Sequence, residues 1–184
     1  ILPSSRYLDA TEVNADKNGF PVIENQLFVL DCKLPLDEVK LFYPKLYTYL
    51  DEGVRAGVSE RYLCKNRKIW YSQENRPESR FYCTYIGRSD KKGKKPFRFV
   101  LNRSKAIVAN SYLILYPKSY LEKEIEQRPE LNKRLLEALN QITGKAMLDE
   151  GRVYGGGMHK MEPKELANVP ATEISLILQE NPNE

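Results

Sequence analysis

Basic and aromatic side chains are concentrated in one stretch of this sequence, residues 61–105. The stretch has 14 basic residues against three acidic ones, a net charge of +11, whereas residues 1–60 and 106–184 are net acidic at −4 and −3. Cations neutralise phosphates and aromatic rings stack on bases, so this pattern favours nucleic-acid binding. The alternative is that the rings form a core and the cations are only solvated. Eight of the 19 aromatic residues lie in the stretch, namely Tyr62, Trp70, Tyr71, Phe81, Tyr82, Tyr85, Phe97 and Phe99.

Residues for an independent active site are not apparent. His159 is the single histidine, and it stands among glycines with no partner at a catalytic spacing. The cysteines Cys32, Cys64 and Cys83 contain no C-x-x-C pair, which argues against a zinc site and against a disulfide framework. We therefore expect no metal and no cofactor in this chain, and no catalysis by the chain alone.

Length and composition limit the class of protein. A chain of 184 residues with 41% apolar residues is long enough to bury a core without disulfides or metals. Its apolar runs are far shorter than the roughly 20 residues that cross a bilayer, and no signal peptide opens it. We expect a cytoplasmic protein with a single domain over residues 1–184. Because the chain starts at Ile1 without Met, we expect it to be part of a larger protein.

The first half of the sequence predicts one strand, a helical region and a hairpin. Residues 25–33 have the pattern of a strand, and residues 36–52 that of a helix that Gly53 ends, with two short helices as the alternative because of Pro44. Residues 81–86 and 97–102 are β-favouring runs on either side of a polar segment. The simplest topology is an antiparallel hairpin whose tip, residues 87–96, is a basic finger. Residues 111–116 predict a buried strand.

The C-terminal third, residues 118–180, is predicted to be mainly helical. Helical patterns cover residues 119–127 and a segment that Pro129 opens and Gly144 ends. A glycine-rich loop at residues 151–161 then precedes a short helical turn at residues 162–168. The expected fold class is α+β, with a mixed or antiparallel sheet, a basic hairpin finger and a helical C-terminal third.

Two stretches of the sequence resemble one protein family. The first spans residues 61–116, RYLCKNRKIWYSQENRPESRFYCTYIGR and then KPFRFVLNRSKAIVANSYLILY, and the second is GRVYGGGMHKMEPKELANVP at residues 151–170. Together they resemble the C-terminal target-recognition region of bacterial DNA adenine-N6 methyltransferases of restriction–modification systems. The resemblance covers most of residues 20–170, in an order of motifs too long to be a short chance match.

The resemblance implies a division of labour within a longer polypeptide. The family's N-terminal domain is a doubly wound sheet that binds S-adenosylmethionine and carries a methylating motif with a Pro-Pro dipeptide. This chain contains no Pro-Pro dipeptide, and its nearest match to the cofactor glycine motif, at residues 154–158, lacks the final glycine. The resemblance therefore implies that this chain reads DNA. Its partners would be double-stranded DNA and the N-terminal methyltransferase domain of the same polypeptide, with no membrane, and S-adenosylmethionine would be needed only in the full-length parent.

Candidate DNA-binding residues follow from the chemistry of phosphates and base edges. We expect phosphate contacts from Lys91, Lys92, Lys94 and Lys95, and guanine or bidentate phosphate contacts from Arg67, Arg76, Arg80, Arg88 and Arg98. Asn102 and Arg103 face either DNA or the fold. Gly155, Gly156, Gly157 and Lys160 form either a loop that faces DNA or a partner domain, or a chain reversal before Glu162.

Two further alternatives remain open at this point. Trp70 and Tyr71 pack either against DNA or, as we favour, against Phe81 or Phe97 in a core. The chain as a whole is either the target-recognition region of a methyltransferase or a stand-alone nucleic-acid-binding module with no methyltransferase partner.

Overall fold

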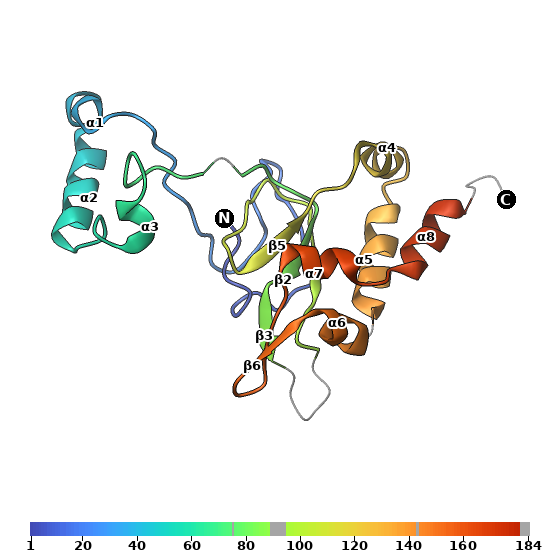
Figure 1. The fold of residues 1–184 in the computed structure, drawn as a ribbon. Coiled ribbons are helices and arrows are strands. Elements are labelled where there is room, and N and C mark those ends of the chain that lie inside the picture. Colours follow the sequence, from blue (N-terminus) through green and yellow to red (C-terminus); the bar gives the residue numbers. More distant parts are fainter. Residues whose placement is uncertain (75, 89–94, 143, 181–184) are drawn as a thin grey trace. The chain divides into compact units, whose positions relative to one another are not determined.

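The computed structural model describes residues 1–74, 76–88, 95–142 and 144–180. These residues form two compact units (Figure 1). Unit 1 comprises Ile1–Leu27 and Pro77–Glu184, and unit 2 comprises Phe28–Arg76. The stretch of high positive charge, residues 61–105, is therefore divided between the two units, which are described separately below.

Unit 2 is a small helical unit built from α1 (Leu36–Phe42), α2 (Pro44–Arg55) and α3 (Tyr62–Lys65). The alternative of two short helices is confirmed, since Pro44 lacks the N–H that a continuous helix needs and begins α2. The prediction that Gly53 ends the helix was wrong, because α2 continues to Arg55. A Cβ at Gly53 would lie 2.9 Å from the Trp70 ring, so this glycine makes room for the packing of Trp70.

The segment that leads into unit 2 was wrongly predicted as a strand over residues 25–33. These residues take no strand conformation, and the segment passes from unit 1 to unit 2 at residue 28. Only its last apolar positions pack on the helices: Leu30 is partly buried there, and Cys32 is buried with Val39 and Leu50. Tyr71 closes the same core and donates a hydrogen bond from its hydroxyl to the Leu34 carbonyl at 2.6 Å.

Unit 1 contains a four-stranded mixed sheet in the order β1-β4-β2-β5. Its strands are β1 (Glu12–Val13), β4 (Phe99–Asn102), β2 (Phe81–Thr84) and β5 (Tyr112–Leu115). The pair β1–β4 is parallel, and β2 is antiparallel to both β4 and β5, with Cys83 opposite Phe99. The predicted mixed α+β class, the antiparallel pairing of residues 81–84 with 99–102 and the strand at residues 112–115 are confirmed.

A second sheet of three antiparallel strands has the order β3-β7-β6. It consists of β3 (Ile86–Arg88), β7 (Met158–Lys160) and β6 (Arg152–Tyr154). The prediction of one strand over residues 81–86 was wrong, because the chain leaves the first sheet at Tyr85 and continues as β3 in the second. The predicted loop at residues 151–161 is instead a β-hairpin, so the glycine run is part of a chain reversal. The tip of the predicted basic finger, residues 89–94, lies outside the described residues.

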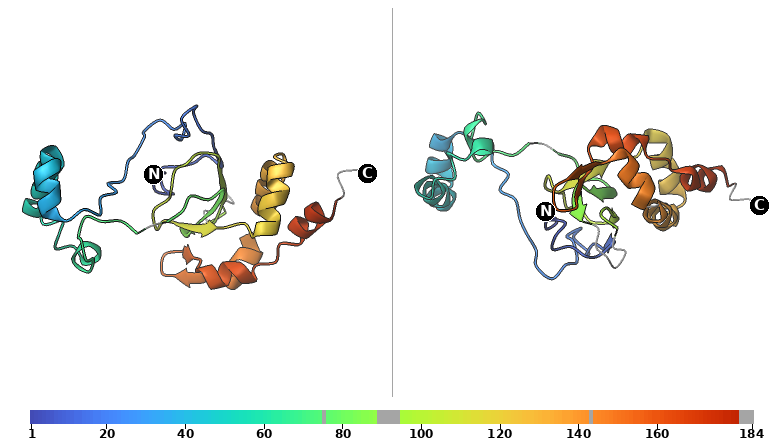
Figure 2. Two further views of the ribbon diagram at one scale, coloured as in Figure 1. Left: turned by 90° about the horizontal axis from the view of Figure 1, so that it is seen from above. Right: turned by 60° about the horizontal axis from the view of Figure 1, so that its bottom comes forward.

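The C-terminal helices of unit 1 lie on one side of the first sheet, where α5 packs on β4 and α8 packs on α5 (Figure 2). They are α4 (Ser119–Gln127), α5 (Leu131–Gln141), α6 (Gly144–Glu150), α7 (Pro163–Asn168) and α8 (Thr172–Gln179). Gly144 begins α6 rather than ending the preceding helix, and α8 was not predicted. No helix in the described ranges is long and apolar enough to cross a membrane.

Alternation along β2 and β4 explains the two cores of unit 1. Phe81, Cys83, Phe99 and Leu101 point to the helices, where they pack with the apolar stripe of α5. Tyr82 and Val100 point to the opposite face, which the N-terminal segment covers with Leu2 and Leu8. The N-terminal segment therefore belongs to the fold of unit 1.

Candidate nucleic-acid interface

A groove of about 390 Å³ opens where the two sheets of unit 1 diverge. Among the described residues, four cationic side chains line it, Arg6, Arg88, Lys95 and Arg98, together with one acidic residue, Asp9. Neutral hydrogen-bonding side chains complete the lining, among them Ser5, Thr84 and Asn140. A concave surface with a net positive charge attracts polyanions, because its walls concentrate the field of the cations.

Local structure explains why these residues come together. The antiparallel pair β2–β4 ends with Thr84 opposite Arg98, and the Thr84 Oγ1 accepts a hydrogen bond from the Arg98 backbone N–H at 3.1 Å. Beyond that point β3 turns away and takes Arg88 to the edge of the groove. Residues 89–94, which include Lys91, Lys92 and Lys94, connect Arg88 to Lys95 and lie outside the described residues.

The turn away from the first sheet depends on Gly87. A Cβ at this position would overlap the carbonyl oxygen of Pro96 and lie 2.6 Å from its carbonyl carbon. Glycine therefore allows the backbones of β3 and residue 96 to touch at the floor of the groove.

Arg98 holds the N-terminal segment against the sheet. Its Nη2 donates to the Ser5 carbonyl at 3.1 Å, and its Nη1 lies 3.6 Å from the Asp9 carboxylate. Its Nε is buried without a hydrogen-bond partner in the described part of the chain. Most of this guanidinium is therefore committed to the fold, which makes Arg98 less available to a ligand than the sequence analysis assumed.

Lys95 is exposed but partly committed to a helix end. Its Nζ donates to the carbonyls of Asn140 and Ile142, at 2.6 and 3.2 Å, where α5 ends. A cation is favoured there by the helix dipole, and the third ammonium N–H remains for a ligand. Asn140 in turn exchanges two hydrogen bonds with the backbone of Phe99, which fixes this helix end on β4.

Arg88 and Arg6 are the cations of the groove that are free to bind. Both side chains are exposed, and neither guanidinium makes an ion pair or hydrogen bond with another described residue. Arg88 was predicted from the sequence. Arg6 was missed, because it lies in the acidic first third of the sequence and nothing in its surroundings marks it.

Three predicted residues lie at the other end of the first sheet. Asn102 is buried, and its amide donates to Ser104 and Ala106 while its Oδ1 accepts from the Ser104 N–H and hydroxyl, so it faces the fold. Arg103 is paired with Glu12 at 3.5 Å, and Arg80 is half-buried. The four residues of β4, or about 13 Å, separate Arg98 from this end.

Two further predicted arginines lie in unit 2. Arg76 is exposed and donates from Nε and Nη2 to the same oxygen of Glu74, Oε2, at 3.0 and 2.7 Å, which lowers the pKa of that carboxyl group. Arg67 is half-buried and lies near the same carboxylate. Trp70 packs edge-on against Tyr71 within the helical core of unit 2, so neither ring packs on Phe81 or Phe97 as favoured above.

Lys160 is engaged with neighbours in unit 1. Its Nζ lies 2.7 Å from Glu162 and 5.0 Å from the centre of the Tyr85 ring, and the Tyr85 hydroxyl donates to the same carboxylate at 3.0 Å. The hydrogen bond to Glu162 raises the pKa of Lys160, and it lowers the pKa of Glu162 in return. Much of the charge of Lys160 is therefore compensated within the chain.

The glycine run does not fit a nucleotide-binding loop. Gly155–Gly157 connect β6 to β7 in an exposed turn, so no helix N-terminus follows them as phosphate binding by a glycine loop requires. No group of three potential metal ligands occurs within the described ranges, and the three cysteines are free. His159 is buried in β7, opposite Gly87.

Comparison with known proteins gives the family. Two relatives each share 25% identity with this chain. "Type II methyltransferase M.XamI" of Xanthomonas campestris pv. amaranthicola aligns over 90% of this chain and 28% of its own length. "Type II methyltransferase M.AccI" of Acinetobacter calcoaceticus aligns over 74% of this chain and 24% of its own length. The chain thus spans about a quarter of the length of the curated relatives it matches. No solved structure matches it significantly. The family described as "Type II methyltransferase M.Eco57I, C-terminal domain" matches residues 5–183, nearly the whole sequence, and the chain belongs to this family of type II restriction–modification methyltransferase domains.

Proposed function

We propose that this chain is the target-recognition region of a site-specific DNA adenine-N6 methyltransferase and that it binds duplex DNA through the cationic groove of unit 1. The observation that carries the proposal is the convergence of Arg6, Arg88, Lys95 and Arg98 on one concave surface. Arg88, Lys95 and Arg98 flank one segment of the sequence, and Arg6 joins them from the N-terminal end. Family membership supplies the context in which DNA is the substrate.

The groove suits a division of roles among its side chains. Arg6 and Arg88 have guanidinium groups with no ion-pair or hydrogen-bond partner among the described residues, so they can bind phosphate in a bidentate manner or contact the O6 and N7 atoms of a guanine. Lys95 has one donor left for a phosphate. Arg98 is best described as a positioning residue, since it holds Ser5 and thereby Arg6 at the groove.

Transfer of the methyl group belongs to the rest of the parent enzyme in this proposal. The amino group of an adenine is accessible only when the base leaves the stack. The parent would use S-adenosylmethionine in its N-terminal domain, while this region holds the duplex in register. Incubation of the isolated chain with DNA and labelled S-adenosylmethionine should therefore transfer no label, and detectable turnover would contradict the assignment.

The salt dependence of DNA binding tests the groove. Each phosphate contact releases condensed counterions and contributes about 0.9 to the slope of log K against log salt. We expect the double variant Arg6→Ala with Arg88→Ala to make this slope shallower by up to about two units. Fluorescence anisotropy with a duplex oligonucleotide at several salt concentrations measures the slope. The double variant Lys123→Ala with Lys133→Ala is the matched control. It removes two positive charges as well, but from exposed lysines of α4 and α5 that lie outside the groove.

Two results would contradict the proposal. Equal slopes for the groove variant and the control, with both proteins folded, would move DNA away from the groove. Preference for single-stranded over duplex DNA would favour the alternative of a stand-alone single-strand-binding module. The expectation for Lys91, Lys92 and Lys94 is unchanged, and their joint replacement by alanine should flatten the slope further without a change in base preference.

A further inference from the structure

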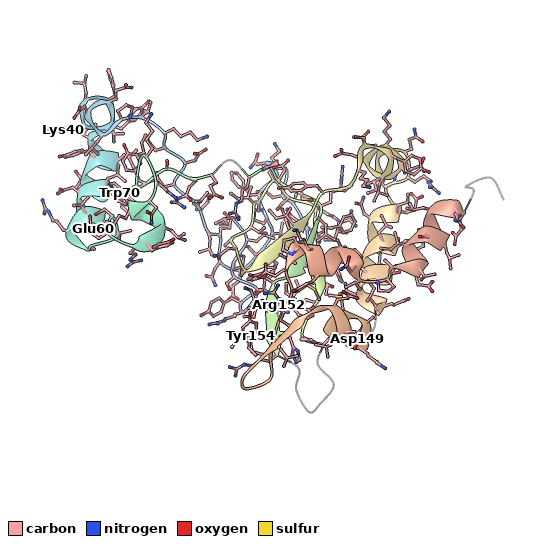
Figure 3. All side chains as sticks on the ribbon, in the orientation of Figure 1. Lys40, Glu60, Trp70, Asp149, Arg152 and Tyr154 are labelled. Carbon is pink, nitrogen blue, oxygen red and sulfur yellow. The ribbon has the colours of Figure 1, made fainter. Side chains whose placement is uncertain are left out.

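The β6–β7 hairpin, residues 152–160, exposes apolar side chains that contribute little to the fold. Val153 is 66% exposed and Tyr154 is 45% exposed, and neither belongs to a core cluster of unit 1. Figure 3 labels Arg152 and Tyr154 on this hairpin. From Val153 to Gly157 the hairpin carries no charged residue, so nothing there repels a phosphate.

The base of the hairpin is held firmly. Arg152 donates from Nε to Glu165 at 2.6 Å, and Lys160 is paired with Glu162 at 2.7 Å. Both carboxylates also form the capping box at the start of α7. The cations of the hairpin are therefore used to attach it to α7, which leaves its tip in a defined position and without available charge.

The backbone conformation requires glycine at two of the three glycine positions of the turn, but not at the third. Gly156 and Gly157 have φ angles of +76° and +70°, a conformation that other residues adopt only with strain. Gly155 has no such angle, and a Cβ placed on it would meet no atom within 4 Å. Packing in unit 1 therefore gives no reason for glycine at position 155, whereas a close approach by another molecule would.

The register of the second sheet relates the tip to the cationic groove. Arg88 of β3 lies opposite Met158 of β7, and Met158 lies opposite Tyr154 of β6. Directly opposed residues point to the same face, so Arg88 and Tyr154 share one face at a separation of two strands, or about 10 Å. The major groove of B-DNA is about 12 Å wide and admits a two-stranded β-ribbon. A duplex whose phosphate is bound by Arg88 can therefore have its groove above Tyr154.

We infer that the β6–β7 hairpin enters a groove of the bound duplex, where the Tyr154 ring packs on the bases and Gly155 allows the backbone to come close. The inference rests on the proposed function, since it assumes that DNA occupies the neighbouring groove. It assigns the two surfaces different chemistry. The cationic groove binds phosphates through charge, and the hairpin tip contacts bases through an uncharged aromatic surface.

This difference gives a sharp experiment on the 184-residue chain. Tyr154→Ala should weaken duplex binding by roughly ten-fold or more, as loss of one good contact to base edges in a groove does. The slope of log K against log salt should stay at the wild-type value, because no counterion release is lost. Tyr154→Phe keeps the ring and should bind within about two-fold of wild type. Tyr120→Ala on α4 is the matched control, since this tyrosine is also exposed and lies outside both surfaces.

Gly155→Val tests the close approach independently of the ring. The added side chain has open space in the free protein, so thermal unfolding should change little while DNA affinity falls at least ten-fold. Wild-type affinity in both Tyr154→Ala and Gly155→Val would overturn the inference. So would a salt slope lowered in Tyr154→Ala, because Tyr154 would then act through a neighbouring charge.

Failure of the inference is distinguishable from failure of the proposed function. If the wild-type chain binds no duplex at all, the proposed function fails. If binding depends on Arg6 and Arg88 but not on Tyr154, the hairpin inference alone is overturned. If Tyr154→Ala impairs methylation by the full-length enzyme and leaves duplex affinity unchanged, the tip contacts the methyltransferase domain, and the inference is overturned in that way.

Discussion

Substitution of Gly87 by alanine tests whether close contact between the backbones of Gly87 and Pro96 lets β3 leave the first sheet. A new Cβ would overlap the Pro96 carbonyl oxygen and lie 2.6 Å from its carbon, whereas two carbons are in comfortable contact at about 3.5–4.0 Å. Because the Pro96 carbonyl oxygen would be only 1.6 Å from the new Cβ, the two backbones would have to separate by about 1.5 Å. Neither backbone can move alone, because Gly87 is paired with His159 in β3–β7 and Pro96 is buried.

The expected cost follows from this geometry. Overpacking of a filled site costs typically about 1–3 kcal/mol, and the involvement of two backbone segments puts the Gly87→Ala variant at about 3 kcal/mol or more. Alanine would otherwise stabilise by up to about 1 kcal/mol through the entropy of the unfolded chain. Gly144→Ala is the matched control, because the added methyl meets no atom within 4 Å at the start of α6, and it should be neutral or slightly stabilising.

Urea denaturation followed by far-ultraviolet circular dichroism measures both variants. Tryptophan fluorescence is a useful second signal, because the single tryptophan, Trp70, reports on unit 2 and not on the site of the substitution. A free energy of unfolding for Gly87→Ala within about 0.5 kcal/mol of wild type would refute the close packing of β3 on residue 96. The same variant should also lose duplex affinity, since Gly87 and Pro96 line the cationic groove.

Three further predictions concern stability. Asn102→Ala should cost about 2–4 kcal/mol in urea denaturation, because buried groups of Ser104 and Ala106 lose their partners, and it should leave the salt slope of DNA binding unchanged. Burial raises the pKa of Cys83 from 9.0 and that of Tyr112 from 10.0, both to about 12. Because both groups ionise more readily in the unfolded chain, the free energy of unfolding should fall as pH rises from about 9 towards 12. The fall should be less steep in Cys83→Ala. Chelator and reductant should leave the melting temperature unchanged, and a fall of several degrees with either would contradict the expectation that the apolar cores suffice.

Local patterns in the sequence were sufficient for much of the secondary structure. The helix at Ser119–Gln127, the apolar stripe of α5 and the strand at Tyr112–Leu115 follow from periodicity over neighbouring residues. The break before Pro44 follows from a missing N–H. The ordered motifs of residues 61–116 and 151–170 were also sufficient to suggest the methyltransferase family, which the match over residues 5–183 confirms.

Long-range contacts decided the features that the sequence analysis got wrong. The run from Phe81 to Ile86 is uniformly β-favouring, and only the contact between Gly87 and Pro96 and the presence of β7 show where it changes sheets. Residues 25–33 have the composition of a strand, yet only Leu30 and Cys32 pack on helices, and the backbone of the segment meets no partner strand in the described structure.

The candidate site shows the same division. Net charge is additive along the sequence, so the sequence by itself determined that this protein carries a strong positive charge in residues 61–105. Whether a given cation is available to a ligand depends on its neighbours in space. The tertiary structure alone decided that Arg98 and Lys160 are largely paired and that Arg88 has no partner among the described residues. It also decided that Arg6, from an acidic part of the sequence, joins Arg88 at the same groove.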